Sequence, residues 1–230
     1  ILERFKIPYT HSGVIPSAIA MDKEISKKLF AKFKIKTPKF FTYSFDKKNP
    51  QLVKIINSKL KFPVVVKPLN EGSSVNVFIC NRKNIFKILN SLKNYKKVMI
   101  EQFIGGREIQ VAILGNRKLG AIELKPKRKF YDYQAKYNTN AKTQHIIKID
   151  LPKKKLNQLL ETAYKAHKIF KCRGVTRSDF KYFNGKFYLL EINTQPGMTK
   201  LSLVPEIAAH HGMSFIELIE WILKDASTKR

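Results

Sequence analysis

GVTRSDFKYFNGKFYLLEINTQPGMT, which spans residues 174 to 199, is the stretch that decides the predicted fold. Its two arms are rich in aromatic and β-branched residues, which favour β-strands. Asn184-Gly185 lies between the arms and is a strong signal for a hairpin turn. The stretch therefore predicts two antiparallel strands joined at this turn.

Four polar residues interrupt these strands at alternate positions: Arg177, Asp179, Glu191 and Asn193. A single strand carboxylate usually lies on a solvated face, but side chains two positions apart share a face, so four polar groups of mixed sign indicate one cluster. A two-residue loop would put Asp179 and Glu191 on opposite faces, whereas a three-residue loop with Gly185 left-handed would put them on one face. We predict the three-residue loop, because two carboxylates and an amide oxygen are hard ligands suited to Mg²⁺.

A sharp turn follows at Pro196-Gly197 and leaves its backbone amides exposed. Such a turn can aim N–H groups at an oxyanion that develops during a reaction. EINTQPGMT, together with the Arg-x-Asp pattern upstream, resembles the C-terminal signature of the D-alanine:D-alanine ligases, a branch of the ATP-grasp carboxylate–amine ligases. The resemblance extends from about Leu2 to Leu223, with five motifs in family order.

The composition bounds the class of protein. The chain has 230 residues, of which 43% are hydrophobic, so it is long and apolar enough to form a globular core. Lys and Arg number 45 against 17 Asp and Glu, a net charge of +28. That charge favours polyanions such as nucleic acid or an anionic membrane surface. The lysines are spread along the whole chain, however, which favours a general lysine bias over a docking arm.

Cysteine usage and hydropathy indicate a location. Cys80 and Cys172 are not in a C-x-x-C spacing, which fits idle thiols in a reducing compartment. No apolar run approaches the roughly 20 residues of a membrane span, and no signal peptide is recognised. We therefore expect a cytoplasmic protein with no membrane or nucleic-acid partner.

A second informative stretch is FPVVVKPLNEGSSVNVFIC, residues 62 to 80. Phe62 to Val66 is a continuous apolar run of the buried-strand type, and Lys67 at its end needs an anionic partner. The loop that follows can wrap phosphate through free amides and hydroxyls, although G-S-S is also an ordinary turn. K-P-x-x-E-G-S-S-V resembles the family's phosphate-covering loop, with Asn76 where the family has glycine. The resemblance implies that ATP contacts Lys67, Glu71, Ser73 and Ser74.

Further ATP contacts are implied by the resemblance alone. Lys23, in MDKEISK, reads by itself as a solvated lysine, but the matching family lysine reaches ATP phosphates. Glu101 would lie near the adenine amino group and Glu108 at the ribose hydroxyls, although each could be an exposed acid at a strand end. Phe103 and Ile104 are adenine-pocket walls or, equally, core residues.

Residues 127 to 143, KRKFYDYQAKYNTNAKT, are polar and aromatic without a clear period, which predicts a long loop. Long loops in compact domains are commonly lids, and interleaved Tyr and Lys could also stack on nucleic acid. F-Y-D-Y-x-A-K-Y matches the ligases' active-site loop. The resemblance places Lys136 at the transferred phosphate and Tyr137 against Ser73, and it favours an amine as second substrate.

The remaining pattern predicts alternating helices and strands. We expect the tail of a helix at residues 1 to 5 and one helix from about Ser17 to Phe33. Further helices are predicted at about 50–60, 84–92, 152–170, 202–211 and 214–225, and strands at 40–43, at 145–149 and in three segments separated by turns at 105–106 and 115–116.

The implied fold class is α+β, an ATP-grasp fold in which two α+β subdomains clasp ATP. We expect residues 1–12 to be the remnant of the family's N-terminal α/β domain, which is otherwise largely absent. Residues 13–104 would form the central subdomain and residues 105–230 the C-terminal one. The resemblance also implies D-alanine as substrate, ATP with Mg²⁺ or Mn²⁺, a homodimer and a role in peptidoglycan synthesis.

The implied chemistry is ATP-dependent activation of one D-alanine to an acyl phosphate, followed by attack of the second. Charge on the γ-phosphate would be offset by Mg²⁺ on Asp179, Glu191 and Asn193 and by three lysines, Lys23, Lys67 and Lys136. Arg177 and the Gly197 amide would stabilise the tetrahedral oxyanion. Ser202 and Leu203, at a helix N-terminus, match positions that hold the second carboxylate.

Three alternatives remain open. Another ATP-grasp ligase would share Lys67, Asp179 and Glu191. A catalytically silent fragment would keep ATP binding alone. A nucleic-acid-binding module is supported only by the charge.

Overall fold

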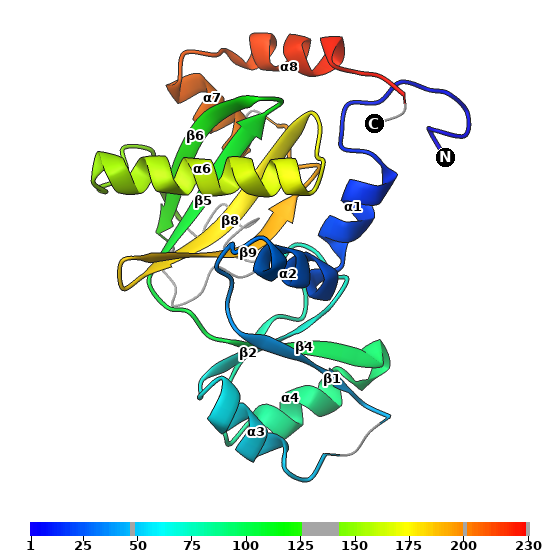
Figure 1. Ribbon diagram of the computed structural model, residues 1–230, viewed down its shortest axis with the longest axis vertical. Coiled ribbons are helices and arrows are strands. Elements are labelled where there is room, and N and C mark those ends of the chain that lie inside the picture. Colours follow the sequence, from blue (N-terminus) through cyan, green and yellow to red (C-terminus); the bar gives the residue numbers. More distant parts are fainter. Residues whose placement is uncertain (47–48, 126–142, 200–201, 229–230) are drawn as a thin grey trace.

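The computed structural model describes residues 1–46, 49–125, 143–199 and 202–228. Two antiparallel sheets, each with its own helices, are stacked along the long axis of the molecule (Figure 1). The smaller sheet has the strand order β1-β4-β2-β3. Its elements are β1 (Phe40–Ser44), α3 (Leu52–Lys59), β2 (Val64–Pro68), β3 (Phe78–Cys80), α4 (Ile85–Ser91), the 3-10 helix η1 (Lys93–Tyr95) and β4 (Lys97–Gln102).

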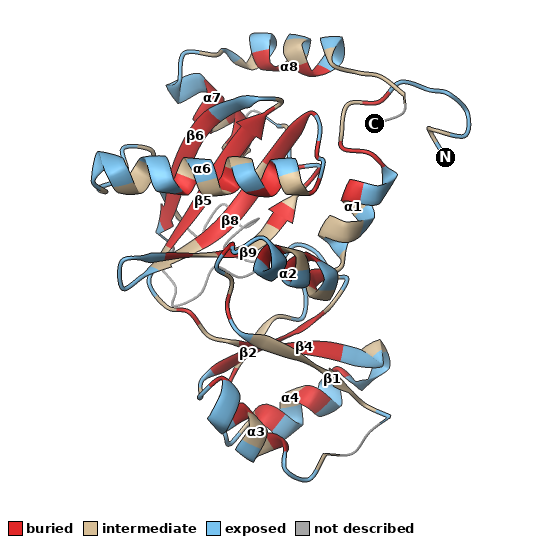
Figure 2. Ribbon diagram, viewed as in Figure 1, coloured by how far each residue is buried: buried red, intermediate tan, exposed pale blue. Residues whose placement is uncertain are grey.

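One face of the smaller sheet is apolar and packs on α3 and α4, because alternate residues of β2 and β4 form a cluster with Leu52, Ile56 and Leu89. The opposite face carries Lys67 and Glu101. That face points toward the second sheet (Figure 2).

The larger sheet has the order β7-β6-β5-β8-β9. Its strands are β5 (Arg107–Leu114), β6 (Arg117–Lys125), β7 (Gln144–Ile146), β8 (Val175–Phe183) and β9 (Lys186–Asn193). Helix α6 (Lys153–Ile169) covers one face over a cluster that includes Val111 and Phe180. Helices α7 (Leu203–His210) and α8 (Phe215–Lys224) cover part of the other, over Ala112, Ile122 and Val175. Farther along β8, the same face changes from apolar to charged at Arg177 and Asp179.

The N-terminal helices pack on the larger sheet. The structure has two helices, α1 (Val14–Met21) and α2 (Lys23–Lys32), where one was predicted. Asp22 separates them: its backbone is extended, and its side chain accepts hydrogen bonds from the Glu24 and Ile25 amides, both at 2.9 Å. Residues 1 to 5 form a turn and not the predicted helix tail, although the Phe5 amide donates to the Ile1 carbonyl. The placement of α2 sets the direction of Lys23, its first residue.

The β8–β9 hairpin corrects the predicted loop. Phe183 pairs with Lys186, so the loop has two residues, and Asn184 and Gly185 have φ values of 46° and 71°, as a type I′ turn requires. The predicted three-residue loop is therefore wrong. Asp179 nevertheless lies opposite Glu191, because Leu190 is the extra residue of a β-bulge that shifts the register by one.

Most other predicted elements are confirmed within a few residues, including the 17-residue α6 and α8, which the structure shows to begin at a capping box on Ser214. Strands β2 and β7 are shorter or shifted relative to prediction. Both cysteines are free and buried. In the part of the chain that is described, no helix is long and apolar enough to cross a bilayer.

Candidate active site

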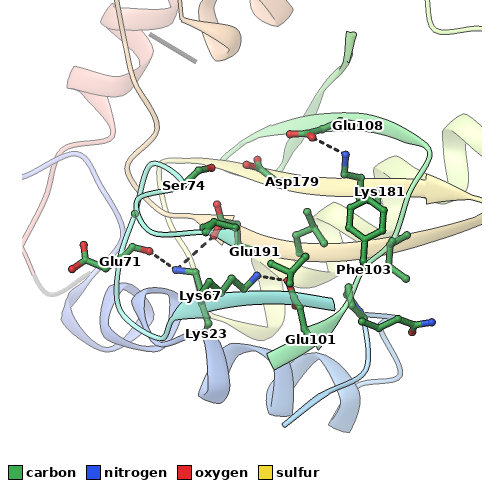
Figure 3. Close-up of a pocket in the computed structure, with 17 residues that line it drawn as sticks. Lys23, Lys67, Glu71, Ser74, Glu101, Phe103, Glu108, Asp179, Lys181 and Glu191 are labelled. Atoms are coloured by element: carbon green, nitrogen blue, oxygen red, sulfur yellow. Dashed lines mark hydrogen bonds and ion pairs between the residues drawn. The ribbon is translucent and has the colours of Figure 1, made fainter. Parts of the chain in front are cut away.

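A cleft lies between the charged faces of the two sheets (Figure 3). Its lining comes from α2, from the ends of β2 and β4, from the loop after β2 and from the β8–β9 hairpin. Ten of the residues predicted for ATP or metal binding line it: Lys23, Lys67, Glu71, Ser74, Glu101, Phe103, Ile104, Glu108, Asp179 and Glu191. Segments more than 150 positions apart in the sequence thus contribute to one cavity.

On the smaller sheet, Lys67 and Glu101 form a buried ion pair with Lys67 Nζ 2.5 Å from Glu101 Oε1. They are brought together by the pairing of β2 with β4, which places Glu101 opposite Val65, two positions from Lys67. Lys27 reaches the other carboxylate oxygen at 2.8 Å. Burial alone raises the pKa of Glu101, but the two ammonium groups outweigh it and hold the pKa at about 2. Glu101 is therefore ionised and has both oxygens engaged by lysines.

Lys23 joins the two walls of the cleft. Its ammonium donates a hydrogen bond to the Glu71 carbonyl and lies 3.9 Å from Glu191 Oε2 (Figure 3). Burial lowers the pKa of Lys23, while Glu191 acts in the opposite direction. A buried cation that donates one hydrogen bond to a loop carbonyl is well placed to exchange that bond for one to a phosphate oxygen.

The loop after β2 is built from unusual backbone conformations. Ser73, Ser74 and Asn76 have φ values of 51°, 58° and 55°. Residues in this left-handed region turn successive amides toward one side, the arrangement that binds anions in nests. Asn76 replaces the glycine expected from the family, adopts the positive φ that Asn tolerates well, and donates a hydrogen bond of 2.7 Å to the Tyr95 hydroxyl.

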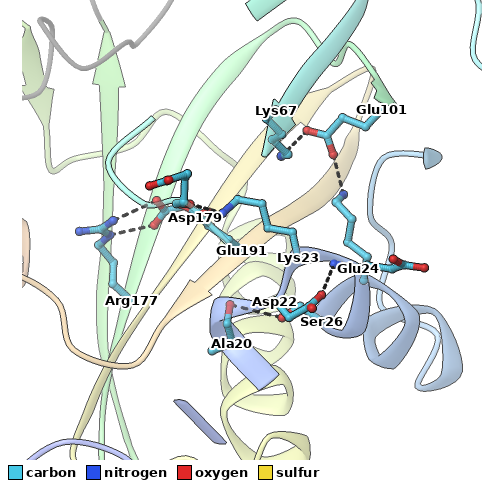
Figure 4. Close-up of polar contacts among 12 residues, drawn as sticks. Ala20, Asp22, Lys23, Glu24, Ser26, Lys67, Glu101, Arg177, Asp179 and Glu191 are labelled. Carbon is cyan, nitrogen blue, oxygen red and sulfur yellow. Dashed lines mark hydrogen bonds and ion pairs between the residues drawn. The ribbon is translucent and has the colours of Figure 1, made fainter. Parts of the chain in front are cut away.

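On the larger sheet, Arg177 and Asp179 form a bidentate pair (Figure 4). Arg177 Nε and Nη2 lie 2.8 and 3.0 Å from the two Asp179 oxygens. Glu191 lies opposite Asp179, and Asn193 lies opposite Arg177. The Asn193 side-chain oxygen accepts a hydrogen bond of 3.0 Å from the Gln195 amide. All four predicted polar residues therefore share one face of the hairpin.

The oxygens of the hairpin suit a Mg²⁺ ion that is also bound by phosphates and water, and not a metal held by protein ligands alone. Among the described residues, no three His, Cys, Asp or Glu side chains gather as a metal site. Mg²⁺ in phosphate-transfer sites is usually held by one or two carboxylates together with substrate phosphates and water. Asp179 and Glu191 provide the two carboxylates and Asn193 an amide oxygen, so the donor chemistry suits that arrangement.

Glu108 on β5 contacts a residue that the sequence did not single out. Lys181 Nζ lies 2.9 Å from Glu108 Oε2, because these residues pair across β5 and β8. Lys181 also lines the cleft. Phe103 and Ile104, in the connection from β4 to β5, line it as well. Lys181 lies two positions from Asp179, so the face-sharing pattern used for Arg177 and Asp179 could have found it.

The remaining predicted residues lie outside the cleft lining or outside the described residues. Gly197 is exposed beside Ser202: a Cβ atom on Gly197 would stand 3.0 Å from Ser202 Oγ. Ser202 is the N-cap of α7 and Leu203 its first residue, with Thr199 bonded to Ser202 across the turn. Ser73 belongs to the loop but not to the cavity lining. Lys136 and Tyr137 fall in 126–142, outside the described residues.

Lys27 is the other residue that sequence reasoning missed. Lysines in a lysine-rich helix are usually solvated, yet Lys27 is completely buried. Lys23, Lys27 and Phe30 follow a spacing of four and three, so they share one helix face, and Phe30 is a core residue. That shared face was the available signal.

Two antiparallel sheets that enclose a cleft lined by lysines and carboxylates are the arrangement of the ATP-grasp class of ligase folds. Comparisons with known proteins support this class. Residues 29–224 match the family model described as the D-ala D-ala ligase C-terminus. The D-alanine–D-alanine ligase of Pelagibacter ubique is 67% identical over 230 residues, which cover 100% of this chain and 76% of that protein. The enzyme of that name from Wolbachia pipientis wMel is 42% identical over 98% of this chain and 71% of its own.

Solved structures give the same result. The crystal structure of D-alanine–D-alanine ligase from Bacillus anthracis superposes with a TM-score of 0.86 at 33% identity, over 97% of this chain and 73% of that one. Its complex with ATP superposes with a TM-score of 0.82 at 28% identity, over 97% and 72%. The chain belongs to the D-alanine–D-alanine ligase family.

Proposed function

We propose that this chain is a ligase that joins two D-alanine molecules to D-alanyl-D-alanine, consumes ATP with Mg²⁺ or Mn²⁺, and serves peptidoglycan synthesis. The observation that carries the proposal is the cleft itself, where lysines and carboxylates from two separate sheets face each other. Family membership supports the identity of the substrate.

The first step makes an acyl phosphate. The carboxylate oxygen of the first D-alanine attacks the γ-phosphorus, a new P–O bond forms, and the bond to the β-phosphate oxygen breaks to release ADP. Lys23 and Lys67 are placed to neutralise the phosphate oxygens, with Lys136 from the loop as a third cation in the proposal. The amides and hydroxyls of Ser73 and Ser74 cover the phosphates.

The nucleoside end is assigned to the β4–β5 connection. Phe103 and Ile104 offer apolar contact to the adenine, with Glu101 near the adenine amino group and Glu108 at the ribose hydroxyls. Asp179, Glu191 and Asn193 would hold the divalent ion, which when bound withdraws charge from the transferred phosphoryl group. Arg177 donates a hydrogen bond to each Asp179 oxygen in this structure, and each carboxylate oxygen keeps a second lone pair that can bind the ion.

The second step forms the peptide bond. The amine of the second D-alanine attacks the acyl carbon, the C–N bond forms, the amine loses its proton, and the C–O bond to phosphate breaks. The Arg177 guanidinium and the exposed Gly197 amide are the proposed donors to the tetrahedral oxyanion. Ser202 and Leu203, at the N-terminus of α7, are the proposed site of the second carboxylate, and Tyr137 with Ser73 the contact that closes the loop.

Three further expectations belong to this proposal. The subdomain division at residues 104 and 105 falls between β4 and β5, at the crossing from one sheet to the other. A homodimer is expected from the family and can be measured by light scattering. A cytoplasmic location suits an enzyme that consumes ATP.

Phosphate release from ATP tests the proposal. With Mg²⁺ present, we expect release that depends on D-alanine, and D-alanyl-D-alanine detectable by mass spectrometry. Release that responds to a different carboxylate or amine would assign the chain to another ATP-grasp ligase. ATP-dependent thermal stabilisation without turnover would indicate a silent ATP-binding chain, and salt-sensitive DNA binding without nucleotide stabilisation would overturn the proposal.

A further inference from the structure

Lys27 on α2 is the most deeply buried charge in the described part of the chain that the mechanism above does not use. Its side chain is 0% exposed. The ammonium lies 2.8 Å from Glu101 Oε2, donates a hydrogen bond of 2.6 Å to Thr37 Oγ1, and stands 5.5 Å from the centre of the Phe40 ring. Lys27 is not among the described residues that line the cleft, whereas Glu101 and Lys67 are.

The three charged groups do not cancel. Lys27 and Lys67 carry two positive charges against the single negative charge of Glu101, so the cluster keeps a net charge of +1 in a buried setting. Unbalanced buried charge is costly in the absence of a counter-ion. Burial lowers the pKa of Lys27 to about 8, with Glu101 opposing the shift. An anion that enters the cleft beside Lys67 balances this excess.

The two lysines therefore have different positions relative to a ligand. Lys67 Nζ binds the carboxylate oxygen on the cleft side, and Lys27 occupies the other oxygen from behind. If Glu101 had only one ammonium partner, the two groups would form a closed, neutral pair. The buried pair would then carry no net positive charge to attract a phosphate.

We propose that Lys27 is a positioning residue for nucleotide binding, which neutralises the Glu101 carboxylate and so leaves the positive charge of Lys67 uncompensated for phosphate oxygens. The inference rests on the proposed function, because it takes the phosphates of ATP as the ligand of Lys67. Lys27 also links the two halves of the molecule, since α2 packs on β9 through one face while its Lys27 contacts β4.

Calorimetric binding of the non-hydrolysable analogue AMP-PNP with Mg²⁺ tests this role. We expect Lys27→Met to weaken binding at least about tenfold, since the buried cluster loses the net positive charge that attracts the phosphates. Lys28→Met is the matched control on the same helix: Lys28 is 68% exposed and pairs only with Glu24 in the described contacts, and its variant should bind as the unmodified chain does.

A double substitution separates positioning from loss of structure. Lys27→Met with Glu101→Gln frees Lys67 from its carboxylate, so we expect AMP-PNP to bind more tightly than to Lys27→Met alone. Lys27→Gln, which keeps a hydrogen-bond donor without charge, replaces Lys27→Met if thermal melting shows that variant to be unfolded. Equal binding by the unmodified chain and the Lys27 variants, or a double variant no better than the single one, would overturn the inference.

The same data distinguish the two proposals. If the unmodified chain does not bind AMP-PNP, the proposed function fails. If it binds the analogue and turns over D-alanine while Lys27 variants bind equally well, only the role of Lys27 fails.

Discussion

The two walls of the cleft hold their charges in different ways. In the Lys27–Glu101–Lys67 cluster, the side chains are 0%, 5% and 9% exposed, and both carboxylate oxygens have lysine partners. On the hairpin wall, Arg177, Asp179 and Glu191 are 17%, 6% and 36% exposed. One wall is buried throughout and cationic in excess, and the other is rich in carboxylates, buried at Asp179 and more exposed at Glu191.

This difference indicates two functions within one cavity. Buried, multiply bonded charges are preorganised and cost little further reorganisation when a phosphate arrives. On the hairpin wall, Arg177 shares the two Asp179 oxygens that are the proposed ligands of the cation. We therefore expect substitutions on the hairpin wall to change turnover and metal dependence, and substitutions on the buried wall to change nucleotide affinity.

The largest expected effect is that of Arg177→Ala. Removal of the proposed oxyanion donor should lower kcat by about 10²- to 10³-fold, while the Kd for ATP changes less than about threefold. Steady-state kinetics together with calorimetry measure both quantities. Arg177→Lys, which keeps the charge without the fork geometry, should recover only part of the loss. Normal turnover by Arg177→Ala would remove Arg177 from the mechanism.

A buried histidine away from the cleft shows what burial without a ligand does to a titratable group. His167 on α6 is 2% exposed, and its Nδ1 lies 2.9 Å from Thr176 Oγ1. Burial and the nearby Lys168 lower its pKa from 6.5 to about 4. Between pH 6.5 and pH 4, His167 therefore binds more protons in the unfolded chain than in the folded one. Its contribution to the free energy of unfolding is present above pH 6.5, and about 3 kcal/mol is lost as the pH falls toward 4.

Urea denaturation at pH 7 and pH 4 measures this effect. The unmodified chain should lose more free energy of unfolding than His167→Gln does over the same range. Equal losses would mean that His167 does not titrate as its burial predicts.

The hairpin wall is also expected to set the metal requirement. Glu191→Gln should raise the Mg²⁺ concentration for half-maximal turnover by at least about tenfold, because one of two carboxylates is lost. Glu220→Gln, on the solvent side of α8 and 58% exposed, is the matched control. An unchanged Mg²⁺ requirement in Glu191→Gln would place the ion elsewhere.

The smallest effect is expected at the phosphate loop. Tyr95→Phe removes the exposed hydrogen bond from Asn76 and should weaken ATP binding by no more than about threefold, since such bonds contribute little net free energy in water. Asn76→Gly should behave similarly. A loss of tenfold or more in Tyr95→Phe would make this loop contact as important as the buried wall.

The sequence predicted the positions of site residues correctly where they follow from strand alternation and from the order of the motifs. Asp179 and Glu191 were expected on one face, and they are. The reason given was wrong, because Asn184-Gly185 forms the two-residue turn that its residues favour, and the compensating bulge at Leu190 has no visible signature among apolar residues.

Lys27 shows a different limit. Its burial depends on Glu101, which lies 74 positions away and reaches it only after β4 pairs with β1 and β2. Local pattern cannot specify a partner across such a distance, so the sequence did not single out Lys27. Lys67 was recognised because its own strand is apolar enough to demand a partner.

The most direct measurement is a crystal structure of the chain with AMP-PNP and Mg²⁺. The phosphate oxygens should lie within hydrogen-bond distance of Lys23 and Lys67, with the ion bound to Asp179 and Glu191. Nucleotide bound outside the cleft, or an ion held by other residues, would contradict the account.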